Sequence, residues 1–250
     1  MHGDDEAVLL ELDHEGRITL LGLGDAGRVR ALVGAAGHRR VGWMTIPRIG
    51  AGPAGFLGEP SDDGPRHSAE EDLDLAVQRR LGVGPASAWD WLVTAVRPTD
   101  VDPAVVRLDP AAEREAILDC LRESNPDTSA DPGHPGEAAW FGVRGDGALL
   151  GVIGAGELRG APEGGDRSWH LHGLGVRPAA RGRGLGGALT AAATAAGLDA
   201  GADWVSLGMY ASNTVARRVY ERLGFTVEGR FTSYRAVAPV TTASAESPCQ

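Results

Sequence analysis

The stretch 169–186, WHLHGLGVRPAARGRGLG, constrains the fold more than any other part of the chain. Residues 169–176 alternate between two faces, as a β-strand requires, and the strand should end at Arg177-Pro178 because proline has no N–H for a sheet ladder. A glycine-rich turn, Arg181–Gly186, follows, and an alanine-rich helix is predicted over residues 187–200. Such a turn exposes backbone N–H groups at the positive end of the helix dipole, where a phosphate or pyrophosphate can bind.

The charge around this turn is opposite to that of the whole chain. The 250 residues carry a formal net charge of −10. Residues 167–198 nevertheless contain no Asp or Glu, and they contain four arginines: Arg167, Arg177, Arg181 and Arg183. This local excess of positive charge favours an anionic ligand.

Two motifs in this part of the chain together resemble a known family. Val176-Arg-Pro-x-x-Arg181-x-x-Gly184-x-Gly186 is similar to the acyl-CoA-binding signature of the GNAT superfamily of N-acyltransferases. Asn213-Thr-Val-Ala216-Arg-Arg-Val-Tyr220-Glu-Arg-Leu-Gly224-Phe225 resembles the next motif of that superfamily, at the expected distance and beyond a predicted strand at residues 204–210. The resemblance covers roughly residues 105–237 and says little about the residues before them.

The resemblance implies acetyl-CoA as the acyl donor and assigns residues to it. The backbone of Leu174, Gly175 and Val176 would bond the pantetheine arm and polarise the thioester carbonyl, in a gap where this strand splays from its neighbour. Asn213 would contact the donor and also cap the last helix. The backbone of the glycine turn would hold the pyrophosphate, because a Cβ there would keep the phosphate away, while the arginines add charge: Arg181, Gly182, Arg183, Gly184, Leu185, Gly186 and Gly187. A tight strand–helix connection with solvated arginines is the alternative.

The resemblance also implies a proton donor and a proton acceptor. The family's tyrosine at Tyr220, two helical turns after Asn213, protonates the departing CoA thiolate; a core tyrosine is the alternative. Where many members carry a glutamate base this chain has His170, and His-Leu-His resembles arylalkylamine N-acetyltransferases, whose paired histidines deprotonate the substrate ammonium. His170 as base and His172 as relay share one face of the strand. The alternatives are histidines satisfied by neighbours in the sheet, or a metal site with His134 as third ligand; we expect no metal.

The acceptor is expected to be a small-molecule primary amine. It would attack directly without an acyl-enzyme, since neither motif contains a Cys or Ser nucleophile. Residues 125–137 occupy the region that shapes the acceptor site in the family, and Asp127, Asp131 and Glu137 would favour a cationic amine; a solvated loop is the alternative. Acetylation of a protein or peptide N-terminus and a non-catalytic CoA-binding sensor are the alternative functions. Three aromatic residues are expected in the core rather than in a substrate pocket: Trp140, Trp169 and Tyr210.

Composition limits the class of protein. A hydrophobic content of 42% and a charged content of 23% are ordinary for a globular chain with a real core, and no run approaches the ~20 apolar residues of a membrane span. The acidic start, MHGDDEAVLLELD, predicts a cytoplasmic protein without a signal peptide. The acidic balance argues against nucleic acid as a partner, and a homodimer stays open. The chain has no lysine, which excludes a lysine nucleophile, and Cys120 and Cys249 are not expected to pair.

We predict an α/β fold with a mixed sheet: a GNAT domain at 104–238, preceded by a smaller α/β unit at 1–100 and followed by a disordered tail at 239–250. The first unit, of unknown role, is a candidate for a degenerate half of the GNAT fold. In it, Gly22-Leu-Gly24-Asp-Ala-Gly27 matches the dinucleotide fingerprint GxGxxG. No acid ends the following strand, and Asp25 would face the pyrophosphate, so an ordinary turn is preferred over NAD(P) binding.

The remaining elements follow from periodicity and turn residues. In the first unit strands are predicted at 7–13, 17–23, 40–46 and 89–96, with helices at 26–36 and 69–81 and a loop at 49–65. In the GNAT domain the other strands are predicted at 105–108, 140–144, 149–157, 226–228 and 231–237, and the other helices at 111–124 and 213–223. This order of elements is the order of a GNAT fold.

Overall fold

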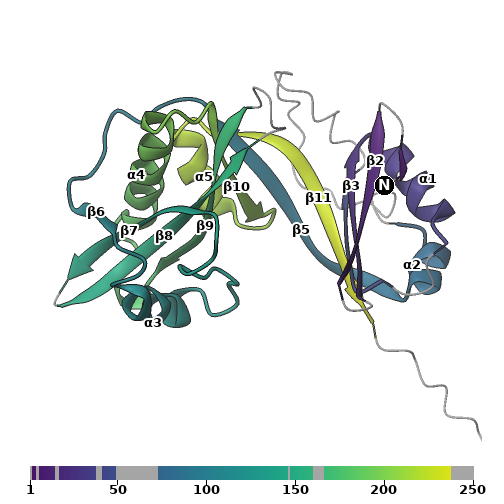
Figure 1. Cartoon of the computed structure of the whole chain (residues 1–250), viewed down its shortest axis with the longest axis horizontal. Helices are drawn as coiled ribbons and strands as arrows, with labels where there is room; N and C mark the ends of the chain where they lie inside the picture. Colours follow the sequence, from purple (N-terminus) through teal and green to yellow (C-terminus); the bar gives the residue numbers. More distant parts are fainter. Residues whose placement is uncertain are drawn as a thin grey trace, which may run out of the picture. The chain divides into compact units, whose positions relative to one another are not determined.

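The computed structural model describes residues 2–3, 6–14, 17–37, 41–48, 73–145, 147–159 and 166–237. These residues form two compact units, drawn in Figure 1. The first contains the described residues up to Trp89 and those from Gly229 onwards, and the second spans Asp90–Glu228. Two strands, β5 (Val83–Thr94) and β11 (Thr226–Ala236), contribute to both units. The predicted loop at 49–65, the start of the predicted helix at 69–81, Cys249 and the tail at 239–250 lie outside the described residues.

The first unit is a mixed sheet with two helices. Its strands follow the order β1-β2-β3-β4-β11-β5. Strands β2 and β3 are antiparallel, α1 connects β3 to the parallel strand β4, and β11 runs antiparallel to β4. The buried core includes Leu20, Val29, Met44 and Tyr234. The bounds are β1 (His2–Gly3), β2 (Ala7–His14), β3 (Arg17–Gly24), α1 (Ala26–Ala35), β4 (Trp43–Pro47) and α2 (Leu75–Leu81).

The GxGxxG match in this unit has a packing explanation. A Cβ at Gly22 would come within 2.2 Å of Val29 Cγ1, so the glycine lets α1 lie close to β3. Asp25 caps α1 by accepting a hydrogen bond of 2.9 Å from the Arg28 N–H. The start of the helix therefore already carries a carboxylate of its own, which agrees with the ordinary turn preferred from the sequence.

The second unit is also a mixed sheet, covered by helices on both faces. Its strands follow the order β5-β10-β9-β8-β7-β6; β10 is parallel to β9, and the pairs from β9 to β6 are antiparallel. The predicted fold class is confirmed. The bounds are β6 (Val105–Leu108), α3 (Arg114–Ser124), β7 (Glu137–Gly145), β8 (Ala148–Arg159), β9 (Arg167–Val176), a 3-10 turn (Pro178–Ala180), α4 (Leu185–Asp199), β10 (Trp204–Tyr210) and α5 (Thr214–Arg222).

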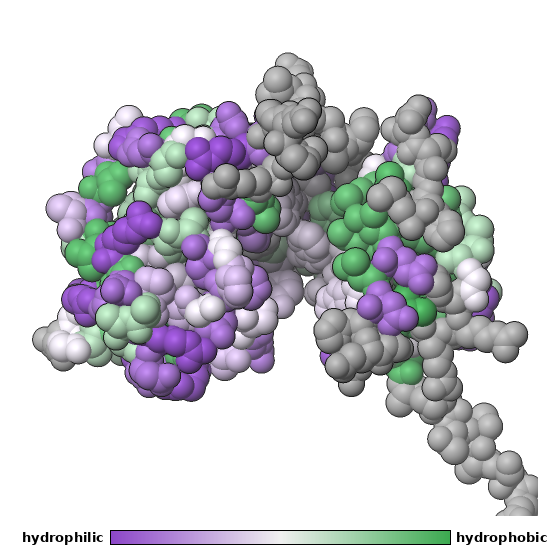
Figure 2. All heavy atoms as spheres, viewed as in Figure 1, coloured by the Kyte–Doolittle hydropathy of each residue, from purple (hydrophilic) through white to green (hydrophobic). Residues whose placement is uncertain are grey.

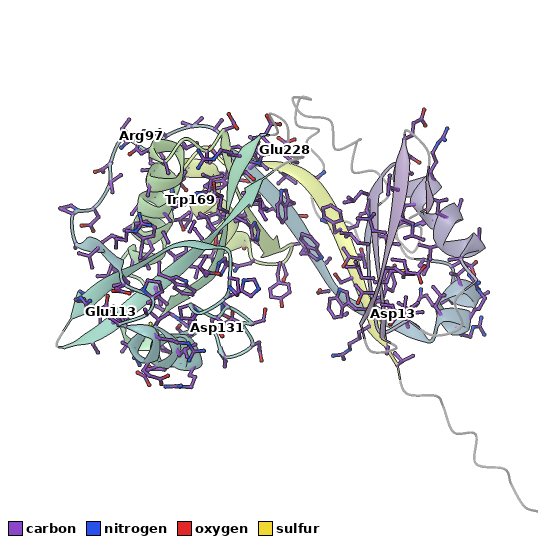
Figure 3. All side chains as sticks on the ribbon, viewed as in Figure 1. Asp13, Arg97, Glu113, Asp131, Trp169 and Glu228 are labelled. Carbon is purple, nitrogen blue, oxygen red and sulfur yellow. The ribbon has the colours of Figure 1, made fainter. Side chains whose placement is uncertain are left out.

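The two faces of this sheet bury different clusters, and Figure 1 shows α3 and α4 on opposite sides of the strands. The cluster beneath α4 and α5 includes Trp169 and Leu171 of β9. The cluster beneath α3 includes Ile117 and Trp140. Because neighbouring residues of a strand point to opposite faces, His170 and His172 lie on the α3 side. Figure 3 shows Trp169 in the interior of this unit.

Among the elements whose bounds differ from the sequence prediction, three have a clear physical reason or change the topology. Strand β5 begins at Val83, because Gly82, with φ of 66°, ends α2 and the chain turns directly into the sheet. Strand β11 is continuous where Gly229-Arg230 predicted a break. Helix α3 begins at Arg114 rather than at residue 111, because the Asp109 carboxylate caps a separate turn before it.

The surfaces of the two units differ in hydropathy. Figure 2 shows hydrophilic side chains spread over the visible face of the second unit, whereas the first unit shows a larger apolar area. In the first unit Leu12, Leu23 and Trp43 are 62%, 42% and 42% exposed. None of the helices in the described part of the chain combines the length and apolar character needed to cross a membrane.

Candidate active site

Strand β9 is interrupted by a β-bulge between the histidine pair and the glycine turn. Its register with β8 shifts at Gly173 and Leu174, which together stand opposite Ile153. Gly173 has φ of 58°, a left-handed conformation that glycine adopts readily. The parallel pairing with β10 ends at Leu171 and Leu207. Beyond the bulge β9 therefore pairs with no described residue of β10, as a splayed strand requires.

His170 lies before the bulge in a closed, aromatic environment. Its Nδ1 is 3.1 Å from Ser206 Oγ, and its ring stacks on Trp91 with centroids 4.5 Å apart and planes 1° apart. Burial, with a smaller contribution from the charge of His172, lowers the pKa of His170 to about 4. His170 is therefore neutral at neutral pH.

His172 has a charged partner that the sequence placed in the acceptor loop. Its Nε2 lies 3.1 Å from Oε1 of Glu137, the first residue of β7. The other oxygen, Oε2, accepts a hydrogen bond of 2.6 Å from Trp140 Nε1. The Trp140 ring also meets the His172 ring edge-on, with centroids 5.5 Å apart. From the sequence Glu137 is expected as an acid of the loop 125–137, and no local pattern indicates its contact with His172.

Strand β8 carries glycines where these side chains cross it. A Cβ at Gly154 would lie 2.6 Å from the His172 ring and 2.7 Å from the Trp140 ring, so only glycine allows their contact. Gly156 pairs with Glu137 on one side and His170 on the other. The nearest atom to a Cβ at Gly156 would be a backbone oxygen at 3.6 Å. The face of the sheet that carries the histidines is therefore less crowded at Gly156 than at Gly154.

The candidate acid, Tyr220, lies in the other core cluster. It is 8% exposed, packs against Phe225, and burial raises its pKa above the usual value. Within the described chain it contacts neither histidine ring, and its hydroxyl receives no hydrogen bond. Asn213 caps α5 by accepting a hydrogen bond of 3.0 Å from the Ala216 N–H. Asn213 thus lies at the N-terminus of α5 and Tyr220 within this helix, but Tyr220 is not brought into contact with the histidines.

The glycine turn forms an open cradle. Gly182 and Gly184 have φ values of 76° and 78°, and Gly184 is the N-cap of α4 without a side-chain cap hydrogen bond. A Cβ at Gly182, Gly184 or Gly186 would meet no atom within 4 Å. The N–H groups of the first turn of α4 are thus left for an external partner, and the space above them is free. Such a cradle fits the pyrophosphate of acetyl-CoA.

Two of the four arginines near this turn are already paired with acids. Arg177 forms ion pairs with Asp119 and Glu123 of α3. Arg167 pairs with Glu157 of β8. The segment is free of acids in sequence but not in space, so the expectation that all four arginines indicate a ligand is wrong for these two.

Arg181 and Arg183 remain at the turn. Arg181 donates to the carbonyls of Val176 and Ser124, which anchors its guanidinium beside the cradle. Arg183 is exposed and has no partner in the described chain. Both cations are thus placed to attract a phosphate.

The loop before β7 contains acids of three kinds. Asp131 is bound by the Arg114 guanidinium at 2.9 Å and lies at the edge of the unit (Figure 3). Asp127 is exposed, and of these three acids only Glu137 pairs with a histidine of β9. The Asn125 amide donates to the Leu174 carbonyl at 3.3 Å, which connects this loop to the bulge. The described residues contain no cluster of three or more His, Cys, Asp or Glu that could hold a metal.

The remaining residues singled out in the sequence are placed as follows. Trp140 and Trp169 are buried, as predicted, whereas the prediction of a core position for Tyr210 is wrong, since it is 64% exposed. Cys120 lies on the buried face of α3, and burial raises the pKa of its thiol. The thiol is therefore not a nucleophile of this site.

Residues 106–225 match the model of the acetyltransferase (GNAT) family. This segment is a GNAT acetyltransferase domain, and the resemblance seen in the two motifs is confirmed. The narrower likeness of His-Leu-His to arylalkylamine N-acetyltransferases stays a prediction. No curated protein matches the chain.

Solved structures share the fold over most of the chain. A GCN5-related N-acetyltransferase from Kribbella flavida, 17% identical, covers 92% of this chain and 87% of its own, with a TM-score of 0.56. A protein described as a GNAT-family acetyltransferase from Novosphingobium aromaticivorans, 22% identical, covers 86% and 82%, with a TM-score of 0.54. A GCN5-related N-acetyltransferase from Sphaerobacter thermophilus, 16% identical, covers 91% and 75%, with a TM-score of 0.52. At these identities the likeness concerns the fold alone.

Proposed function

We propose that this protein transfers an acetyl group from acetyl-CoA to a primary amine of a small molecule by direct attack. The observation that carries the proposal is the position of the bulge at Gly173 and Leu174, between the histidine pair and the glycine turn of a GNAT acetyltransferase domain. A donor seated on the glycine turn and extended along β9 beyond the bulge would place its thioester beside the histidines. Holding the thioester and the acceptor side by side would remove the entropic cost of bringing two molecules together from solution during the reaction.

Acetyl-CoA would supply the acetyl group as an activated thioester. The backbone N–H groups of residues 182–187 would hold its pyrophosphate, and Arg181 and Arg183 would add positive charge. The N–H groups of residues 174–176 would orient the pantetheine and polarise the thioester carbonyl. Asn213 uses its side-chain oxygen as a helix cap, which leaves its amide NH₂ for the donor.

The proton of the amine is assigned to His172 rather than to His170. A group whose pKa is about 4 would not retain a proton taken from an ammonium at neutral pH, and burial imposes this value on His170. His172 is partly exposed and has a carboxylate beside it, which can stabilise an imidazolium. His170 would then act as a neutral wall of the acceptor site, together with Trp91. This reverses the roles of base and relay given to the pair from the sequence.

The face of the sheet at Gly156 is the proposed acceptor site, because Gly156 pairs with Glu137 on one side and with His170 on the other. Tyr220 is the proposed acid. Burial raises the pKa of its phenol above the usual value, so the phenol is protonated near neutral pH and can donate a proton to the departing thiolate. A reaction of this kind needs no covalent acyl-enzyme.

The test is thiol release from acetyl-CoA with a panel of small amines and short peptides. We expect turnover with small amines and a loss of about 100-fold or more in kcat in His172→Gln, the lower end of what a positioned base contributes. His134→Gln, which changes an exposed histidine, should behave as wild type. Turnover with peptides alone would mean that the acceptor is a peptide N-terminus and not a small amine. Binding of CoA without turnover on any acceptor would overturn the proposal in favour of a sensor.

A further inference from the structure

Two ring nitrogens of different kinds lie beside the Glu137 carboxylate. Trp140 Nε1 can only donate, and Trp140 is fully buried with no acceptor for this N–H in the described chain except Glu137 Oε2, at 2.6 Å. His172 Nε2, which can donate or accept, lies 3.1 Å from Oε1. The side chain of Glu137 is 11% exposed, so water does not replace these partners freely. The carboxylate accepts a hydrogen bond from Trp140, and its second oxygen lies within hydrogen-bond distance of His172 Nε2.

This arrangement fixes which nitrogen of His172 carries the proton. If Nε2 donates to Glu137, the neutral imidazole has its lone pair on Nδ1. The ring cannot rotate freely, because the edge of His172 packs against Trp140 over Gly154, where any side chain would collide with both rings. The basic nitrogen is thus held on the side of the ring away from Glu137.

We propose that Glu137 is a positioning residue for acetyl transfer: it holds His172 in the tautomer with Nδ1 free to take the proton of the acceptor amine, and its charge stabilises the imidazolium that forms. The inference rests on the proposed function. In the step, an N–H bond of the acceptor ammonium breaks and an N–H bond to His172 Nδ1 forms, while Glu137 stays ionised. The freed amine lone pair then attacks the thioester carbonyl.

A carboxylate is needed because an amide cannot satisfy two donors. In Glu137→Gln the side chain has one oxygen and one NH₂ group. The oxygen should turn to Trp140, whose buried N–H would otherwise lose its only acceptor. The NH₂ group then faces His172 Nε2 and forces this nitrogen to accept, so that the proton moves to Nδ1 and blocks the base. The isosteric substitution should therefore reverse the tautomer.

The experiment uses the full chain with ¹⁵N-labelled histidine, whose ring nitrogen shifts report the tautomer at about pH 8 without any substrate. We expect a protonated Nε2 on His172 in wild type and a protonated Nδ1 in Glu137→Gln. Thiol release should fall about 100-fold or more in the same variant. Glu157→Gln is the matched control, since Glu157 pairs with Arg167 on the same sheet and should leave both readouts unchanged.

A second substitution separates the tautomer from loss of structure. Trp140→Phe removes the competing donor, so in the variant that combines it with Glu137→Gln the amide oxygen is free to face His172. The Nε2–H tautomer and part of the lost rate should then return. Recovery of both supports the proposal even if Glu137→Gln alone is unstable.

Two results would overturn the proposal: a His172 tautomer that is the same in wild type and Glu137→Gln, or a reversed tautomer with an unchanged rate. An inactive wild type would overturn the proposed function instead. In that case the nitrogen shifts still decide whether Glu137 sets the tautomer of His172, so the two failures are distinguishable.

Discussion

At the scale of single residues, the two histidines of β9 lie in different environments although they share one face of the strand. His170 and His172 are two positions apart on the same face of one strand. His170 stacks on Trp91 and meets a hydroxyl, whereas His172 meets a carboxylate. The first environment disfavours a proton on the His170 ring. The sequence predicts the pair of histidines but not the difference between their environments, because their partners Trp91, Ser206 and Glu137 belong to other strands.

His170 makes the stability of the protein depend on pH. Its pKa is about 4 when folded and about 6.5 when unfolded, so between these values the unfolded chain binds more protons and stability falls as the pH falls. From about pH 7.5 to about pH 5 this histidine should remove roughly 2 kcal/mol from the free energy of unfolding. Urea unfolding of wild type and His170→Gln at both pH values measures it. The variant should lose less stability on acidification, and His134→Gln should lose as much as wild type; equal losses in all three would contradict the low pKa.

Tyr220 offers a test of the proton donor. Tyr220→Phe removes only the hydroxyl, which receives no hydrogen bond in the described chain, so the fold should persist. We expect kcat to fall about 100-fold while the KM for acetyl-CoA changes little, because a proton donor acts in the transition state. Steady-state thiol release measures both constants. Tyr210→Phe, at an exposed tyrosine, is the control, and a wild-type kcat in Tyr220→Phe would remove the tyrosine from the mechanism.

At the scale of elements, local patterns predicted most of the site and distant partners completed it. The strand, the glycine turn and the helix at 169–200 are visible in the sequence, since alternation, proline and glycine act over a few residues. The bulge is not visible, because it depends on the register with β8. The partners of Arg177 are not visible either, since Asp119 and Glu123 lie 58 and 54 residues away. The sequence predicts a strand only from residue 89, whereas β5 already begins at Val83.

Substitution by alanine should affect stability at one glycine of β9 and binding of acetyl-CoA at one glycine of the turn. In Gly175→Ala the new Cβ would lie 2.1 Å from Ser124 Oγ of α3, and we expect a loss of about 1–3 kcal/mol in the free energy of unfolding. In Gly186→Ala the Cβ has no neighbour within 4 Å, so stability should not fall. The KM for acetyl-CoA should instead rise about tenfold, equivalent to about 1.4 kcal/mol, because the Cβ occupies the phosphate cradle.

Urea unfolding and steady-state kinetics on both variants separate packing from ligand binding. Each variant serves as the control of the other, since both replace a glycine by alanine and only the position differs. A Gly186→Ala protein with an unchanged KM for acetyl-CoA would argue against the cradle as the pyrophosphate site.

At the scale of the whole molecule, the division of the chain differs from the boundary predicted between residues 100 and 104. The second unit begins at Asp90, within β5, and the part of β5 in this unit supplies groups that its interior needs. Leu92 is completely buried in the cluster beneath α4, and the buried carboxylate of Asp90 forms an ion pair with Arg217 of α5. Trp91 covers His170. A boundary drawn at residues 100–104 would therefore remove a core strand together with a wall of the proposed site.

Two fragments that share their end at Val237 test this placement. A fragment that begins at Val83 retains all of β5, and we expect it to unfold cooperatively on heating. A fragment that begins at Ala104 should lack this transition, because β10 becomes an exposed edge, the Leu92 site is empty and Arg217 loses its buried partner. Circular dichroism measured against temperature distinguishes them. Leu92→Ala in the full chain should lower the free energy of unfolding by about 2–5 kcal/mol, which shows the contribution of this strand without truncation. Equal transitions in both fragments would mean that β5 is dispensable and that the second unit folds from residue 104 onwards.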